Sequence, residues 1–201
     1  MKKVGERAWL LEWDDAEEET ANARARAARR RLEESAPLGL VDAVPAARSL
    51  LVTGDESFDA AALEDLQDAA PEASAGREHL VVVTPDGLDL PDVLSTCGLR
   101  EADLWGTFTR IPFVVGFLGF SPGFPYLYGL PPELRLARRP SPRVAVPTGS
   151  VALAAGYAGI YPSAMPGGWN LIGTTRFVLF DADATPPATL SPGDTVRFQL
   201  A

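Results

Sequence analysis

The sequence predicts an α+β protein in two parts, an α/β sandwich over residues 1–84 followed by a β-barrel over residues 85–201. Helix and strand patterns alternate in the first part, whereas glycine, proline and aromatic residues interleave from residue 116 to residue 175. Glycine adopts backbone conformations that strain other residues, and proline removes a hydrogen-bond donor and fixes φ. A helix cannot run through such a stretch, so we expect short strands joined by tight turns, and the functional site among them.

The first part contains six segments with regular patterns, in the order strand, helix, strand, strand, helix, strand. They are Ala8–Trp13, a helix from Asp14 to about Glu34, Leu40–Ala46, Ser49–Thr53, a helix ending near Ala70, and Leu80–Thr84. Asp14 and Asp15 supply an N-cap and an acidic first turn for the first helix, and Ser57 or Asp59 caps the second. This order is that of a ferredoxin-like sandwich, in which two helices cover one face of an antiparallel sheet.

Two short helices and a series of strands are predicted for the second part. The segments Leu90–Cys97 and Arg100–Thr107 have helical patterns and are separated by Gly98. From residue 111 to residue 198 the chain consists of strands and turns, and its last strand is Thr195–Leu200. An all-β barrel with glycine- and proline-rich loops fits this half.

Composition excludes several classes of protein. Hydrophobic residues make up 46% of the chain and charged residues 22%, which is ordinary for a globular protein. No apolar run approaches the ~20 residues of a membrane helix, and the N-terminus lacks the features of a signal peptide, so we expect a cytoplasmic protein with no membrane contact. The net charge of −9 lies almost wholly in the N-terminal part, and no basic face for binding nucleic acid is evident.

The chain has one cysteine, Cys97, and one histidine, His79. No disulfide can form within the chain, and a metal site with several histidine or cysteine ligands is excluded. A Ser-His-Asp triad would need His79 as its base. We therefore expect no metal in this chain and assign no catalytic residue.

Several residues of the glycine- and proline-rich stretch could form a binding site. Tyr126, Tyr161 and Trp169 lie beside turns, where a ring can line a cleft, although core packing is the simpler explanation for Trp169. Arg143 could clamp a carboxylate or phosphate through its planar guanidinium, or form a surface or interdomain salt bridge. Both alternatives remain open.

Ser150, Arg138 and Arg139 are weaker candidates. Ser150 has no base near it in the sequence, so a hydroxyl or backbone contact to a ligand is more plausible than a nucleophile. The two arginines lie in a loop flanked by prolines, where they could add to an anion site, although exposure alone explains them.

Five blocks of this half resemble one known family. They are Gly119–Leu127 (GFSPGFPYL), Val146–Val151 (VPTGSV), Gly159–Pro162 (GIYP), Pro166–Trp169 (PGGW) and Ile172–Gly173 (IG). In this order and spacing they are similar to the family of component B of bacterial 5-oxoprolinase, also called allophanate hydrolase subunit 1, which includes inhibitors of a sporulation histidine kinase. Val4–Ala8 and Val41–Arg48 resemble the family's opening strand and hairpin, so the resemblance spans nearly the whole chain.

The resemblance implies a ferredoxin-like domain followed by a cyclophilin-like β-barrel with a carboxyltransferase-type role. It also implies a heteromeric complex of several subunits. Besides component B, these are a homologous barrel subunit, component C, and a metal-dependent subunit, component A, and together they hydrolyse 5-oxoproline to glutamate at the expense of ATP. In fused relatives the B and C halves form the carboxyltransferase part of urea carboxylase.

Four positions depart from the family's pattern. Phe108 stands where many members carry a histidine, and Tyr157 where they carry a glutamine. Met165 replaces the serine of a Ser-Pro-Gly-Gly-Trp block, and Thr174 replaces an arginine. Because catalysis needs polar groups aimed at developing charge, these changes count against full activity in this chain.

Two functional hypotheses follow. In the first, the chain is an enzyme subunit that is inactive alone and shares a site with component C. In the second, it is a catalytically degenerate binding or regulatory module, such as a histidine-kinase inhibitor. Both use a substrate- or partner-binding cleft, for which we predict nine residues: Phe120, Phe124, Tyr126, Arg143, Gly149, Ser150, Tyr161, Gly167 and Trp169.

Overall fold

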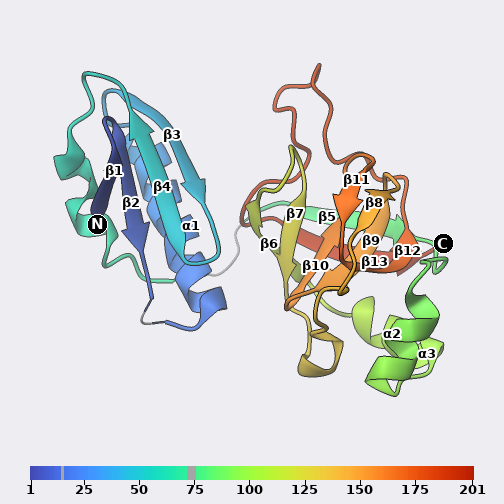
Figure 1. Ribbon diagram of the computed structural model, residues 1–201. Helices are drawn as coiled ribbons and strands as arrows, with labels where there is room; N and C mark the ends of the chain where they lie inside the picture. The colour runs from blue at the N-terminus through green and yellow to red at the C-terminus, as the bar shows by residue number, and fades with distance from the viewer. Residues whose placement is uncertain (15, 72–75) are drawn as a thin grey trace. The chain divides into compact units, whose positions relative to one another are not determined.

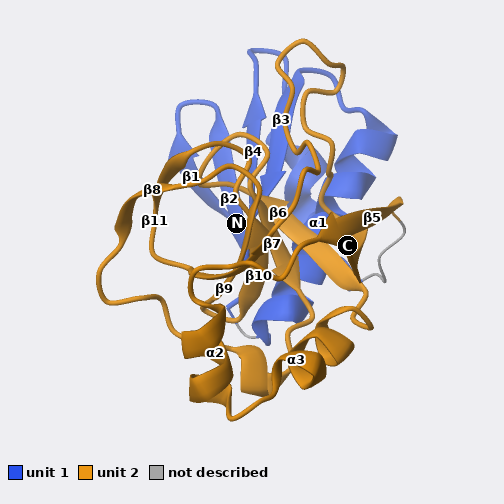
Figure 2. Ribbon diagram, turned by 90° about the vertical axis from the view of Figure 1, so that its right-hand side faces the viewer, with its two compact units in different colours: residues 1–75 blue, residues 76–201 orange. Residues whose placement is uncertain are grey.

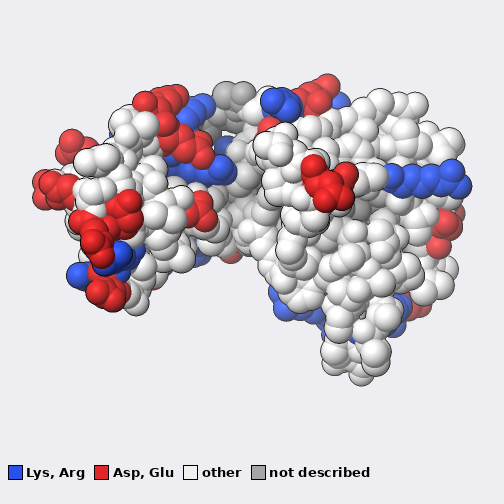
Figure 3. Space-filling model, turned by 90° about the horizontal axis from the view of Figure 1, so that it is seen from above, with Lys and Arg blue, Asp and Glu red and all other residues white. Residues whose placement is uncertain are grey.

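The computed structural model describes residues 1–14, 16–71 and 76–201, which form two compact units, 1–75 and 76–201 (Figures 1 and 2). No helix in these described ranges is long and apolar enough to cross a membrane. Acidic side chains crowd the face of the first unit that Figure 3 shows, whereas much of the second unit's face in that view is uncharged.

The first unit is a four-stranded antiparallel sheet with one α-helix and one 3₁₀ helix. Its elements are β1 (Lys2–Gly5), β2 (Ala8–Glu12), α1 (Glu18–Ser35), β3 (Leu40–Pro45), β4 (Ser49–Gly54) and the 3₁₀ helix η1 (Ala60–Leu66). The strand order is β1-β2-β4-β3. As the sequence predicts, Asp59 caps η1, since its side chain accepts a hydrogen bond from the backbone N–H of Ala61 at 3.0 Å. Asp15, predicted to belong to the cap of the first helix, lies outside the described residues.

Helix α1 packs on this sheet through small residues. Ala21, Ala25, Ala28 and Leu32 recur every three to four positions, and all four are buried. This spacing places them on one face of the helix, and their small side chains allow the helix to approach β3 and β4. Asn22, also buried, donates a hydrogen bond to the carbonyl of Ala46, so its amide is not left unpaired in the core.

The predicted ferredoxin-like sandwich is wrong in its last strand. The predicted strand Leu80–Thr84 corresponds to β5 (Glu78–Val83), which pairs in parallel with β13 (Thr195–Leu200) of the second unit. The edge beside β2, where the ferredoxin-like order requires this strand, is occupied by β1 instead. An apolar β-branched run shows that a strand forms but not which strand it pairs with, and the units accordingly divide after residue 75 rather than 84.

The second unit contains a seven-stranded sheet that is nearly closed. Its order is β12-β9-β10-β7-β6-β13-β5. The strands are β6 (Phe113–Leu118), β7 (Pro125–Tyr128), β9 (Ser150–Ala154), β10 (Tyr157–Ile160) and β12 (Asn170–Thr174), together with β5 and β13. Thr84, just after β5, exchanges two backbone hydrogen bonds of 2.8 and 2.9 Å with Thr174 at the end of β12. This bridge joins the two edges of the sheet and gives it a barrel-like form, consistent with the predicted barrel.

Smaller elements surround the barrel. They are α2 (Leu90–Cys97), α3 (Glu101–Phe108), the 3₁₀ helix η2 (Pro132–Leu134) and a separate two-stranded sheet of β8 (Arg143–Val146) and β11 (Met165–Gly167). The two predicted short helices are confirmed, and Gly98 ends the first of them with a φ of +65°. The barrel interior contains the packed rings of Phe108, Phe113 and Phe198, whose centroids lie 4.7 to 5.5 Å apart.

Gly173 is required where the barrel closes. A Cβ at this position would lie 2.5 Å from the carbonyl oxygen of Thr84 and 2.9 Å from a methyl group of Val83. We therefore expect Gly173→Ala to lower the free energy of unfolding by about 1–3 kcal/mol, as overpacking does. Urea denaturation followed by circular dichroism measures this change.

Gly106, in helix α3, is the matched control. A Cβ there meets only the end of the Arg110 side chain, at 3.7 Å. Gly106→Ala should raise the free energy of unfolding by about 0.5–1 kcal/mol, because alanine is favoured inside a helix. We call the bridge between Thr84 and Thr174 the seam of the barrel. Equal effects of the two substitutions would contradict the close approach of Gly173 to Thr84 at this seam.

Candidate functional site

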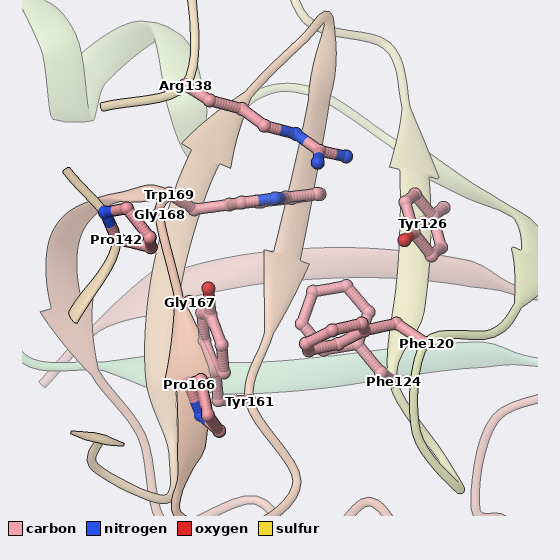
Figure 4. Close-up of a pocket in the computed structure, with 10 residues that line it drawn as sticks. All are labelled: Phe120, Phe124, Tyr126, Arg138, Pro142, Tyr161, Pro166, Gly167, Gly168 and Trp169. Carbon is pink, nitrogen blue, oxygen red and sulfur yellow. The ribbon is translucent and has the colours of Figure 1, made fainter. Parts of the chain in front are cut away.

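A cavity of about 260 Å³ lies in the second unit, walled mainly by aromatic rings and glycine- or proline-containing backbone (Figure 4). We call it the aromatic pocket. It is lined by Phe120, Phe124, Tyr126, Arg138, Pro142, Tyr161, Pro166, Gly167, Gly168 and Trp169. These residues come from the β6–β7 turn and β7, from the segment before β8, and from the stretch between β10 and β12. Three of the five sequence blocks therefore meet at one cavity.

Phe124 holds the walls of the aromatic pocket together. Its ring is 1% exposed and makes edge-to-face contacts with Tyr161, Trp169 and Tyr126, at centroid distances of 5.2, 5.3 and 5.3 Å. Such pairs each contribute about 0.5–1.5 kcal/mol beyond the area that they bury. The rings of Tyr126, Tyr161 and Trp169 thus share one buried support.

Two glycines allow this packing. A Cβ on Gly159 would lie 2.8 Å from the Trp169 ring and 3.0 Å from the Phe124 ring. A Cβ on Gly167 would clash with the hydroxyl of Tyr161. These two glycines therefore allow the rings to approach the backbone closely. A larger residue at either position would prevent this approach.

Phe120 forms the rim of the aromatic pocket. Its side chain is 64% exposed and its φ is +66°, in the left-handed region, where a residue other than glycine pays roughly 1–2 kcal/mol. The ring contacts Phe124 edge-to-face at 5.6 Å. The fold thus holds a large apolar ring toward solvent at an energetic cost, a combination that is concentrated at functional sites.

Arg138 is the charged side chain of the aromatic pocket. In Figure 4 it lies over one face of the Trp169 indole, with its guanidinium toward Tyr126. Its charge is close enough to lower the pKa of both tyrosine hydroxyls, against the larger effect of burial. Among the described residues none forms an ion pair or hydrogen bond with it. Its guanidinium is therefore available to a ligand.

Arg143, a predicted site residue, forms a salt bridge instead. Its guanidinium lies 2.6 Å from the carboxylate of Asp89, and Arg139 lies 2.7 Å from the same oxygen. The other Asp89 oxygen accepts a hydrogen bond of 2.8 Å from the backbone N–H of Leu171, at the start of β12. Asp89 is 2% exposed, so the interaction is buried and lies within the second unit rather than between the two. Of the two alternatives left open for Arg143, the geometry supports the salt bridge.

Gly149 and Ser150 lie behind the aromatic pocket and do not line it. Gly149 has a φ of +79°, and its backbone N–H donates to the carbonyl of Tyr161 at 2.8 Å. The Ser150 hydroxyl, 2% exposed, donates to the carbonyl of Pro147 at 2.8 Å. Their role in this geometry is to fix the backbone that carries Tyr161.

The four positions that depart from the family pattern lie mostly away from the aromatic pocket. Phe108 is in the barrel interior, and Thr174 donates a hydrogen bond to Asp86 at 2.8 Å beside the seam. Met165 packs behind the aromatic rings. Tyr157 also contacts the walls, with its ring edge-to-face against Tyr126 at 5.3 Å.

Sequence reasoning missed several residues of this site. Pro142, Pro166 and Gly168 line the aromatic pocket through backbone shape, and Asp89 was not singled out at all. A signal for Asp89 is present, since the acid directly precedes the Leu-Pro that opens a helix. That position favours aspartate for reasons of capping, which hides its role as an ion-pair partner.

The tyrosines of the aromatic pocket act as hydrogen-bond donors. Burial raises the pKa of Tyr126 and of Tyr161 above the ordinary value of about 10. The backbone N–H of Trp169 donates to the Tyr161 hydroxyl and opposes this effect without cancelling it. Both hydroxyls therefore stay protonated near neutral pH and cannot serve as bases there.

Comparison with known proteins identifies close relatives. The family model for the carboxyltransferase domain, subdomain C and D, matches residues 1–190. The 5-oxoprolinase subunit named B of Escherichia coli O157:H7 is 40% identical over 168 residues, which cover 79% of this chain and 77% of that protein. The subunit of the same name from Bacillus subtilis (strain 168) is 31% identical over 218 aligned positions, covering 98% and 91%.

A solved structure has the same fold. The crystal structure of TTHA0988 matches with a TM-score of 0.84 at 40% identity, over 97% of this chain but only 40% of that one. The chain described here therefore spans less than half the length of TTHA0988.

The buried Asp89 ion pair should dominate the stability of the second unit. Asp89→Ala leaves the Arg143 guanidinium and the Leu171 N–H without their acceptor, while Arg139 keeps only its contact of 3.4 Å with Asp92. We expect this substitution to cost about 3–5 kcal/mol of unfolding free energy. Arg138→Ala removes an unpaired, exposed charge and should change stability by less than about 0.5 kcal/mol. Urea denaturation of both variants tests this contrast. A small loss of unfolding free energy in Asp89→Ala would show that the stability of the second unit does not depend on this ion pair.

The raised tyrosine pKa values predict the course of an alkaline titration. Because burial disfavours the phenolate, Tyr126 and Tyr161 should ionise above pH 10. Ultraviolet difference absorbance of phenolate in the wild type, in Tyr126→Phe and in Tyr161→Phe assigns the two components. Phenolate formation at either residue below pH 9 would contradict the assignment of both hydroxyls as donors.

Proposed function

Because the chain belongs to the carboxyltransferase-domain family of subdomains C and D, we propose that it is a non-autonomous subunit of an ATP-dependent 5-oxoprolinase-type complex. Its relatives in Escherichia coli and Bacillus subtilis bear the name of the B component of 5-oxoprolinase. In this proposal the chain binds part of the substrate or an intermediate and relies on other subunits for the chemical steps that open 5-oxoproline to glutamate.

The composition of the aromatic pocket is the observation that carries the proposal. The ten lining residues include no aspartate, glutamate, histidine, cysteine or lysine. The two tyrosine hydroxyls are protonated, and a guanidinium does not give up its proton. The aromatic pocket can therefore bind and orient a ligand, but it offers no general base or nucleophile for hydrolysis.

A homologous barrel subunit, component C, is the partner that we propose, with the metal-dependent component A beside it. The relatives are named as one lettered subunit of 5-oxoprolinase, which implies a complex of several subunits. In TTHA0988 the same fold is part of a chain more than twice as long, so there it is covalently joined to further protein. The exposed ring of Phe120 at the rim supplies a contact for such a partner.

ATP fits poorly in the aromatic pocket. Magnesium-bound triphosphates call for carboxylate ligands and several cations, whereas the lining residues offer one guanidinium and no carboxylate. In the described part of the chain, no three histidine, cysteine, aspartate or glutamate side chains are grouped to hold a metal ion. We therefore propose that ATP is bound by another subunit of the complex.

A second candidate is a binding or regulatory module without enzymatic activity. The absence of catalytic groups from the lining and the exposed, strained Phe120 are compatible with docking of a protein partner such as a histidine kinase. The two candidates differ in whether an assembled complex turns over 5-oxoproline.

Reconstitution distinguishes them. The chain is co-expressed with components C and A from the same genome, and the purified material is assayed for ATP-dependent conversion of 5-oxoproline to glutamate. We expect co-purification and turnover for the complex, and no turnover for the isolated chain. Stable assembly without turnover, or no assembly at all, would favour the regulatory module.

Phe120→Gly is the informative variant in this assay. Glycine relieves the positive φ, so the isolated chain should be no less stable, while loss of the ring should weaken assembly by about 1–2 kcal/mol. Val178→Ala, at an equally exposed apolar position away from the aromatic pocket, is the matched control and should assemble normally. Unchanged assembly of Phe120→Gly would remove the rim from the interface.

A further inference from the structure

Every side-chain polar group that lines the aromatic pocket can donate a hydrogen bond, and no anionic side chain competes for them. The guanidinium of Arg138, the indole N–H of Trp169 and the hydroxyls of Tyr126 and Tyr161 are these groups. The raised pKa of each tyrosine keeps its proton in place near neutral pH. A cavity of donors with one fixed positive charge complements an anion.

The neighbouring arginines show why Arg138 is the residue left for a ligand. Arg139 and Arg143 both bind the buried carboxylate of Asp89, at 2.7 and 2.6 Å, so their charges are neutralised inside the protein. Arg138, one position away from Arg139 in the chain, has no such partner among the described residues and is exposed. In Figure 4 its side chain extends above the Trp169 indole, with the guanidinium toward Tyr126.

The remaining walls favour a small cyclic ligand. The rings of Phe124 and Tyr126 stand at 87° and 75° to the Trp169 indole, with centroids 5.3 and 5.7 Å from it. Aromatic walls of this kind offer a large apolar contact area to a ring placed between them. The volume of about 260 Å³ lies just below the ordinary range for drug-sized ligands, so a single small ring is the size that fits.

We propose that the aromatic pocket binds a small carboxylate attached to a single small ring, with Arg138 as the residue that recognises the carboxylate. A guanidinium holds a carboxylate through two parallel hydrogen bonds, and the tyrosine hydroxyls add further donors. A phosphate presents the same kind of oxygens, but it carries more charge than one guanidinium neutralises. The choice of 5-oxoproline as the ligand rests on the proposed function, whereas the carboxylate specificity rests on the aromatic pocket alone.

Titration of the isolated chain tests this assignment without requiring an active complex. The probe is 5-oxoproline, followed through the indole N–H resonance of Trp169 in proton–nitrogen correlation spectra, which Trp169→Phe assigns. 2-Pyrrolidinone has the same ring without the carboxylate, and inorganic phosphate is an anion without a ring. We expect a saturable shift with 5-oxoproline, and much weaker shifts with the two other compounds.

Substitution of the arginine identifies the contact. Arg138→Gln should weaken 5-oxoproline binding on the order of 10- to 100-fold, the loss expected for charged hydrogen bonds. Arg138→Lys should recover part of it, because the charge remains while the planar fork is lost. Arg176→Gln is the matched control, since Arg176 is also exposed and unpaired among the described residues but lines a different groove, and it should bind like the wild type.

Several results would overturn the assignment. They are equal binding of 2-pyrrolidinone, phosphate binding as tight as that of 5-oxoproline, unchanged affinity in Arg138→Gln, or no saturable shift with 5-oxoproline. Turnover by the reconstituted complex together with any of these would refute the role of Arg138 while leaving the proposed function intact. Specific binding of 5-oxoproline by the isolated chain, without turnover by the reconstituted complex, would support the role of Arg138 and contradict the proposed function.

Discussion

The buried carboxylate of Asp89 determines the arrangement on which the aromatic pocket depends. It precedes α2, accepts the backbone N–H of Leu171 at the start of β12, and pairs with Arg143 on β8 and Arg139 in the preceding segment. A buried carboxylate without such partners would cost several kcal/mol. Displacement of any one of these segments would therefore destabilise the arrangement of the others. Two walls of the aromatic pocket follow from this one interaction, because Trp169 lies two residues before Leu171 and Arg138 one residue before Arg139.

The glycines and prolines of the sequence blocks act through packing rather than chemistry. Gly159 and Gly167 leave room for the rings of Trp169 and Tyr161, and Gly149 adopts a positive φ so that its N–H reaches the Tyr161 carbonyl. Phe120 is the exception, because it accepts the same unfavourable φ without being glycine. Glycine would adopt this φ at a lower energetic cost than phenylalanine. Its absence from position 120 indicates that the phenylalanine side chain itself is needed, and for this reason the proposed interface includes Phe120.

Sequence patterns predicted the aromatic lining and the class of fold, but not the pairings that connect distant residues. Tyr126 could be predicted as a wall residue because it lies beside a glycine- and proline-rich turn. Core packing was the simpler explanation for Trp169, and this ring is indeed only 5% exposed although it also lines the aromatic pocket. The strand β5 was recognised, yet its partner β13 lies more than a hundred residues away, and strand propensity carries no information on pairing. The two alternatives for Arg143 could not be decided from sequence for the same reason, since its salt-bridge partner Asp89 lies 54 positions away.

The departures from the family pattern carry less weight once their positions are considered. Phe108 fills the barrel interior and Thr174 bonds to Asp86 beside the seam, so neither change removes a polar group from the aromatic pocket. Tyr157 supports the wall through Tyr126, which a more polar residue would do less well. Every polar side chain that lines the aromatic pocket can donate a hydrogen bond, and none of the lining side chains is a carboxylate, imidazole, thiol or amine. In the proposed complex, this chain selects an anion and holds it, and the proposal assigns the proton transfers and the leaving group to residues of another chain.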